Sequence, residues 1–150
     1  MISLVTLAHR ASSIHNRYAT IHSAVFACSI TQMKISFWKR VKPDYCQYES
    51  DLVQLCDQLA DIRSVIERED EVEMANTVSR EFAFALDVYV IALSDAVMSL
   101  STICGRRCRE GRGIEPYSDT QNRADRHEYD NLIQQYRRLG ERLGQLFRRL

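Results

Sequence analysis

The sequence predicts an all-α protein, an antiparallel four-helix bundle, on three observations. Four segments carry apolar residues at alternating spacings of three and four, which places each set on one face of a helix. Five Gly and two Pro are too few for a turn-rich β-sandwich. A chain of 150 residues, 45% hydrophobic and 27% charged, suits one globular domain, so we expect a single bundle over 1–150. Helices with apolar stripes are stable when the stripes meet, and a bundle achieves this.

The first predicted helix covers about residues 2–30. Its apolar stripe consists of Leu4, Leu7, Ala11, Ile14, Tyr18, Ile21, Val25 and Cys28. The region from Met1 to Val25 also has two Arg and no acidic residue, a composition that suits a mitochondrial presequence. We favour a bundle helix because the apolar spacing matches that of the other segments, and we keep mitochondrial targeting as the alternative.

The second predicted helix covers about residues 44–68. Pro43 disfavours helical geometry at the residue before it, and Asp44 can cap a new helix. An acidic run over 67–73 then predicts a solvated turn whose carboxylates suit the start of the third helix. A cation site is the alternative there, but the run lacks the spacing and the central Gly of an EF-hand loop.

The third predicted helix covers about residues 74–104, and the fourth about 119–150. Gly105 is a suitable left-handed cap for the third helix. The intervening residues, 105–118, contain three Gly and one Pro and predict a mobile loop. Ser118, followed three residues later by Gln121, fits a capping box for the fourth helix.

The segment Gln32–Val41 fits the helix pattern least well. It either ends the first helix or forms a separate hydrophobic and basic elbow around Phe37 and Trp38. Together with the basic first helix, this elbow supports an alternative function for the chain, as a helical domain that acts on a membrane or an anionic lipid. No segment is expected to be long and apolar enough to span a membrane.

The charge is segregated along the chain although the net charge is zero. Residues 1–43 have six Lys or Arg and no acid, residues 44–103 have thirteen acids and three Arg, and residues 104–150 have eleven Arg and seven acids. This distribution predicts an acidic central hairpin that packs against basic outer helices. Such pairing selects which helices meet more than it stabilises the fold.

The five cysteines have no regular spacing and are odd in number, unlike a secreted disulfide framework. We therefore expect reduced thiols and a cytoplasmic protein. Cys56 falls in an apolar stripe, where a thiol acts as a small hydrophobic group. Cys104 and Cys108 lie among arginines that would lower a thiol pKa, but their spacing matches neither a redox motif nor a zinc set.

No catalytic or cofactor motif is present, so we expect a protein that is not an enzyme, with no cofactor and no metal. His15 and His22 are seven residues apart, whereas a metal-binding pair on a helix is usually three or four apart. No phosphate-binding glycine loop, nucleophile elbow or Cys/His catalytic signature occurs.

The predicted loop is the first candidate interaction site. Its arginines are Arg106, Arg107, Arg109 and Arg112, and only Glu110 opposes them within this run. We expect this cationic loop to dock on an acidic protein surface, or on the acidic turn of a second copy. Phosphate binding and a solvated loop with no binding role are the alternatives. Nucleic acid is not an expected partner, because Tyr117 is the only aromatic residue near the loop.

The pattern DLxxLxxxLxxIxxVI and a YxxLG-like helix occur within four helical stretches of the chain: Leu4–Tyr18, Asp51–Ile66, Phe84–Leu100 and Tyr129–Gly140. In these stretches the chain resembles the helical N-terminal domains of ascomycete NLR-like (STAND) receptors and related ankyrin proteins. It implies a signalling domain that self-associates or, as in HeLo-type relatives, attacks membranes. It implies no catalytic residues.

The function expected from the sequence is therefore a non-enzymatic helical module that binds a protein partner or self-associates. A homo-oligomer is expected because apolar residues accumulate at the end of the fourth helix. We expect Tyr136 and Phe147 to contribute to that contact.

Overall fold

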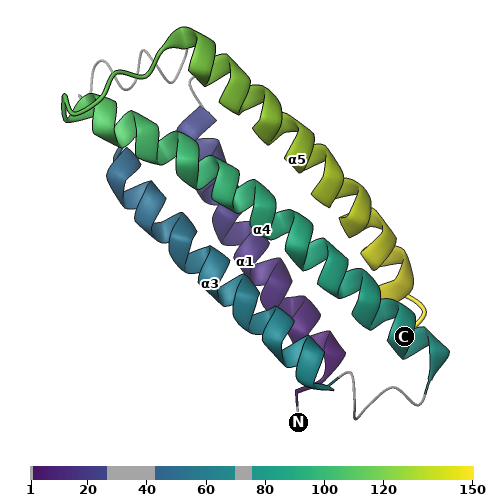
Figure 1. The fold of residues 1–150 in the computed structure, drawn as a ribbon. Helices are drawn as coiled ribbons and strands as arrows, with labels where there is room; N and C mark the ends of the chain where they lie inside the picture. The colour runs from purple at the N-terminus through teal and green to yellow at the C-terminus, as the bar shows by residue number, and fades with distance from the viewer. Residues whose placement is uncertain (1, 27–42, 70–75) are drawn as a thin grey trace.

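The computed structural model describes residues 2–26, 43–69 and 76–150. It contains four α-helices: α1 (Leu4–Phe26), α3 (Tyr45–Glu69), α4 (Thr77–Gly111) and α5 (Asp119–Phe147). The helices alternate in direction along the chain and pack side by side (Figure 1). The all-α, up-and-down four-helix prediction is confirmed. The predicted elbow at Gln32–Val41 and the ends of the predicted helices at 27–30 and 74–75 lie outside the described residues.

A side-chain cap marks the start of each helix. The hydroxyl of Ser3 accepts a hydrogen bond from the Thr6 backbone N–H at 3.2 Å, ahead of α1. The carboxylate of Asp44 accepts one from the Gln47 N–H at 3.1 Å, as predicted. Asn76 and Ser118 cap α4 and α5 through the N–H groups of Val78 and Gln121. These bonds satisfy N–H groups that have no partner inside the helix, so the starts are encoded locally.

Helix α4 is the central element of the bundle, because it packs against α1, α3 and α5. Its predicted stripe is buried at Phe82, Leu86, Leu93, Leu100 and Ile103. The matching stripes of α1 and α3 are buried against it, and Cys56 lies among them as a small hydrophobic group. The helix thus contributes to the core along most of its length.

The predicted end of the third helix at Gly105 is wrong, because α4 continues to Gly111. Gly105 is buried inside the helix, where a Cβ atom would lie 1.8 Å from the Glu49 carboxylate of α3. The glycine therefore permits close approach of a side chain from α3 instead of a helix end. The left-handed residue of the turn is Gly113, with φ 70°. The irregular segment between helices is correspondingly shorter than the predicted loop 105–118.

A disulfide bond joins Cys46, near the start of α3, to Cys108, near the end of α4, with 5.0 Å between the two Cα atoms. The expectation of reduced thiols is therefore wrong for this pair. The pairing could not be predicted from the spacing of the cysteines, because the two are 62 residues apart and only antiparallel packing brings them together. Cys104 is a free, buried thiol, and burial raises its pKa to about 12, which keeps it protonated and unreactive.

Helices α1 and α5 are held together by side chains rather than by close backbone packing. Among the described residues, no Cα atom of α1 lies within 8 Å of one of α5. Large side chains fill this seam. The hydroxyls of Tyr18 and Tyr129 hydrogen-bond each other, and His22 Nδ1 lies 2.6 Å from the Tyr129 hydroxyl. The rings of His15 and Tyr18 both pack edge-on against Tyr136.

The predicted electrostatic attraction between basic α1 and the acidic hairpin is not what holds α1. In the described ranges, no ion pair joins α1 to α3 or α4. Arg17 instead donates a hydrogen bond to the Gln58 side chain at 3.1 Å. Apolar burial and the aromatic seam are therefore the main contacts of α1.

Candidate interaction surface

The outer face of α4 carries a line of exposed apolar side chains. Phe84, Ile91 and Met98 are 72%, 36% and 49% exposed, and each lies seven residues from the next. Val88 falls on the same face and is partly exposed. At about 1.5 Å per residue, Phe84 and Met98 are roughly 21 Å apart along the helix. This line is named here the α4 stripe (Phe84, Ile91 and Met98).

The α4 stripe is not among the interaction residues predicted from the sequence, although its helical spacing is visible there. Phe84, Val88 and Ile91 follow steps of four and three, and Met98 follows seven later, which is helical spacing. The stripe was overlooked because α4 has a second apolar series, the buried one, and one stripe was expected per helix. With an apolar series on each of two faces, α4 is long and apolar enough to cross a membrane by length and composition. The expectation that no segment has this length and composition is therefore wrong. In the bundle, 44% of the most apolar window of α4 is buried.

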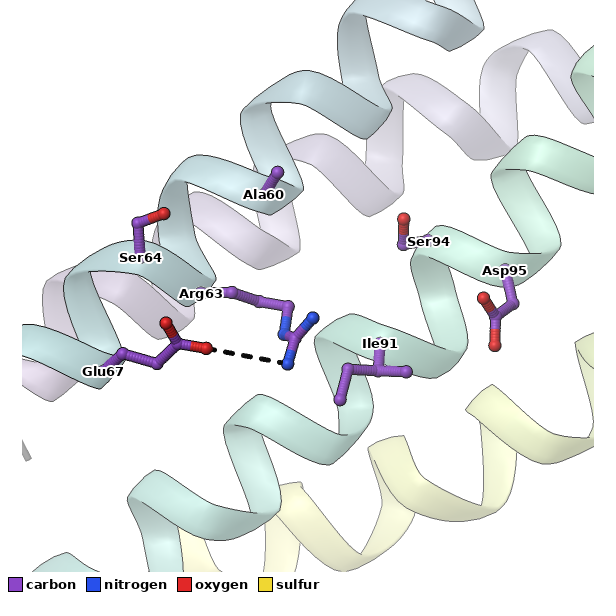
Figure 2. A pocket seen from close by; sticks show the side chains of 7 residues that line it. All are labelled: Ala60, Arg63, Ser64, Glu67, Ile91, Ser94 and Asp95. Carbon is purple, nitrogen blue, oxygen red and sulfur yellow. Dashed lines mark ion pairs between the residues drawn. The ribbon is translucent and has the colours of Figure 1, made fainter.

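A groove runs between α3 and α4 along one side of the stripe (Figure 2). Ala60 and Ser64 form its α3 wall, and Ile91 and Asp95 its α4 wall. Arg63 reaches from α3 across the groove and pairs with Asp87 of α4 at 3.1 Å. The Nη2 atom of Arg63 lies 3.8 Å from the carboxylate of Glu67 on its own helix, the contact dashed in Figure 2.

A second groove lies on the opposite side of α4, between α4 and α5. Met98 and Thr102 line it from α4, and Glu128 and Leu132 line it from α5. Asp95 lines both grooves. The two grooves therefore follow one another diagonally across α4 and meet at Asp95.

The charged side chains that line these grooves are mostly acidic, and Glu67 and Asp125 among them are paired with Arg63 and Arg106. Asp95 and Glu128 are exposed, and neither has an ion-pair partner among the described residues. Asp57 precedes Ala60 and Ser64 at steps of three and four residues, so it lies on the same side of α3, and it is also exposed. Arg63, the one cation lining the grooves, is already paired with Asp87. The surface thus combines exposed apolar groups with unbalanced negative charge.

The four predicted loop arginines lie elsewhere, at the end of the bundle where α4 finishes. Arg106 pairs with Asp125 of α5 at 2.7 Å, and Arg109 pairs with Glu115 at 3.5 Å. The Arg107 guanidinium lies over the rings of Phe26 and Tyr45, 5.6 Å and 5.3 Å from their centres. Arg112 is exposed just after the helix.

The prediction that Arg106, Arg107 and Arg109 lie in a mobile loop is therefore wrong. These three belong to α4 itself, whose extra turns hold them against neighbouring groups. Asp125 is the main acceptor, and it also accepts a hydrogen bond from the Tyr117 hydroxyl at 2.6 Å. Although burial opposes ionisation of Asp125, hydrogen bonds from Tyr117, Gln121 and Arg106 hold its pKa below the usual value.

The two predicted dimer residues differ in their accessibility. Tyr136 is buried in the seam between α1 and α5, so its expected place on an exposed interface is wrong. It was misassigned because a tyrosine on an apolar stripe fits either a core or an interface. Phe147 is 39% exposed, and its ring packs against His9 and Phe82. Leu150 nearby is 49% exposed.

Among residues 2–26, 43–69 and 76–150, no three His, Cys, Asp or Glu side chains are placed to hold a metal ion. His15 and His22 lie instead in the aromatic seam. Burial lowers the pKa of His22, and Arg126 and Arg137 act in the same direction against Asp130. Burial also lowers the pKa of His15, with Arg137 adding to it and a hydrogen bond with Asn16 opposing it. Both imidazoles are therefore neutral at pH 7.

The chain matches no protein-family model, no curated protein and no solved structure. What the structure supports of the resemblance noted in the sequence is a four-helix, all-α domain.

Proposed function

We propose that this protein is a non-enzymatic helical interaction module, and that it binds a protein partner through the outer face of α4. The observation that carries the proposal is the α4 stripe, whose three side chains are exposed at regular helical spacing. Exposed apolar groups arranged in a continuous line commonly mark a protein interface, whereas scattered ones do not. The grooves beside the stripe are open surface features, which suits a polypeptide better than a small ligand that needs enclosure.

A signalling role is part of this proposal. It follows from the resemblance to the helical N-terminal domains of ascomycete NLR-like (STAND) receptors, which implies association with other proteins. A cytoplasmic location also stays a prediction, although its basis in reduced thiols does not hold for Cys46 and Cys108.

Action on a membrane is the second candidate function. Among the residues that the structure describes, the length and apolar composition of α4 favour it. The other basis, the basic elbow around Phe37 and Trp38, lies outside the described residues. The acids beside the stripe oppose contact of this face with an anionic lipid surface, so we place the protein partner first. Leakage of dye from anionic vesicles on addition of the protein would favour the membrane function instead.

Photo-crosslinking in the cells that produce the protein tests the proposed function. A photoreactive phenylalanine analogue replaces Phe84, which lies in the stripe, or Ile114, which is 67% exposed outside it. We expect a discrete cross-linked protein from position 84 and not from position 114. Identical products from the two positions, or none from position 84, would contradict a binding site on α4.

A further inference from the structure

We infer that the partner of this surface is a basic amphipathic helix that crosses α4 diagonally, with a Lys or Arg placed over Asp95. The inference rests on the proposed function and adds the chemistry of the partner. Its basis is the combination of the α4 stripe, the two grooves that meet at Asp95, and the unpaired acids along them.

The shape of the surface suits a helix. Side-chain ridges of one helix pack into the grooves of another at a preferred inclination, so a partner helix crosses α4 obliquely. The grooves are arranged obliquely as well, since one lies towards α3 near Ile91 and the next towards α5 near Met98. A helix along this line would contact Ala60 and Ile91 first, then Met98 and Leu132. An extended strand finds no sheet edge here, because all four described elements are helices.

The charge of the surface selects a basic partner. Asp95 lies at the crossing point, and Glu128 and Asp57 lie to either side without ion-pair partners. A cationic side chain from the partner would balance Asp95 without displacing an existing contact. Complementary charge fixes register and partner choice more than it adds affinity.

The same charges argue against a second copy on this face. Two α4 stripes packed on each other would bring Asp95, Glu128 and their counterparts close together, and like charges in contact are unfavourable. The contact is therefore expected with a different chain.

Fluorescence anisotropy with a defined probe tests the inference. The probe is a labelled alanine-based peptide of roughly 18 residues, long enough to cross both grooves, with leucines at helical spacing and lysines along both borders of the leucine face. A second peptide has glutamate in place of every lysine. We expect the lysine peptide to bind the wild-type protein, more weakly as salt is raised, and the glutamate peptide to bind at least about tenfold less tightly.

Variants of the protein locate the site. Ile91→Ser with Met98→Ser should weaken the lysine peptide by about tenfold or more, because apolar contact is lost. Asp95→Asn should weaken it by roughly threefold, in the range for an exposed ion pair. Asp95→Lys should lose the lysine peptide and improve binding of the glutamate peptide. Val5→Ser on α1 and Glu141→Gln on the far side of α5 are the matched controls, and neither should change binding.

Several results would overturn the inference. These are equal binding of the two peptides, no binding of either, equal effects of the control variants, or no exchange of preference in Asp95→Lys. Self-association or vesicle binding that depends on Ile91 and Met98 would assign the face to a second copy or a membrane. Cross-linking from position 84 would still report a partner in those cases, so the proposed function and this inference fail separately. The replaced side chains are exposed, and circular dichroism with thermal melting verifies that each variant is folded.

Discussion

At the scale of single residues, the main chemical feature of the fold is the pair of neutral histidines in the seam between α1 and α5. His22 shares a hydrogen bond with Tyr129, and His15 packs against the ring of Tyr136. Both imidazoles are partly withdrawn from water, which favours their neutral form. The tyrosine hydroxyls supply the polar partners that the buried seam needs, because a buried hydroxyl without a hydrogen bond is costly.

The histidines predict a pH dependence of stability. Folding lowers the pKa values of both histidines from the unfolded value of about 6.5. At a pH between the unfolded and the folded pKa, the unfolded chain therefore binds more protons than the folded protein. The free energy of unfolding should therefore decrease as the pH falls through this window. Urea denaturation at pH 7.5, 6.5 and 5.5 measures the effect.

Replacing both seam histidines identifies them as the source of this dependence. His15→Gln with His22→Gln should flatten the curve between pH 7.5 and 5.5, whatever the change in absolute stability. His127→Gln is the control, since His127 is exposed on α5. An equally steep curve in the double variant would assign the pH dependence to other groups.

At the scale of helices, the contact between α4 and α5 depends on two glycines of α5 with different surroundings. A Cβ added at Gly140 would lie 3.2 Å from the Tyr89 ring, whereas one added at Gly144 would meet nothing within 4 Å. Gly140 thus permits close packing of the helices, while Gly144 has no packing reason to lack a side chain.

Alanine substitution separates the two glycines. Gly144→Ala should raise the free energy of unfolding by about 0.5–1 kcal/mol, since alanine restricts the unfolded chain and favours a helix. Gly140→Ala should gain less or lose stability, because the Tyr89 ring is buried and has little room to move. Equal gains for the two variants in chemical denaturation would show that α4 and α5 are less closely packed at Tyr89 than described.

The disulfide between α3 and α4 predicts a dependence on reductant. Breaking the Cys46–Cys108 bond releases a constraint on a loop of 62 residues and should lower stability by about 2–4 kcal/mol. Denaturation with and without dithiothreitol measures this change, and the Cys46→Ser, Cys108→Ser protein should no longer respond. Alkylation followed by mass spectrometry should detect two additional thiols after reduction. The same number of alkylated thiols in both conditions would exclude the bond.

At the scale of the whole molecule, apolar periodicity predicted the architecture because the core repeats along each helix. Leu7, Leu59 and Leu93 are fully buried at positions where the stripes place them. Contacts that depend on two distant segments could not be predicted in this way. Two such contacts depend on how α3 lies on α4: the disulfide between Cys46 and Cys108, and the approach of Glu49 to Gly105. The candidate surface was missed for a related reason, since exposure at Phe84 depends on which neighbours leave that face uncovered.

Self-association stays a prediction at the scale of the whole molecule, and we expect it at the end of α5. Phe147 and Leu150 remain partly exposed there, although Leu146 is buried. We predict a weak dimer with a dissociation constant on the order of tens of micromolar, which a small apolar patch can support. Sedimentation velocity should show concentration-dependent association that Phe147→Ser reduces. The matched control is Ile114→Ser, which is 67% exposed before the start of α5 and should associate like wild type. A strictly monomeric protein over that range would contradict the prediction.

The side-chain seam between α1 and α5 has a consequence for how the bundle assembles. Helices α3, α4 and α5 pack closely in sequence order, and a disulfide joins the first two. In the described part of the chain, α1 instead meets α5 through side chains, mainly the tyrosines and histidines of the seam and Phe26 beneath Arg126. The unit with the fewest close contacts opens at the lowest free energy cost. Amide protons of α1 should therefore exchange with deuterium before those of α4, and acid should widen the difference as the seam histidines take up protons. Assembly would end with α1 closing onto a hairpin and a third helix that are already in place.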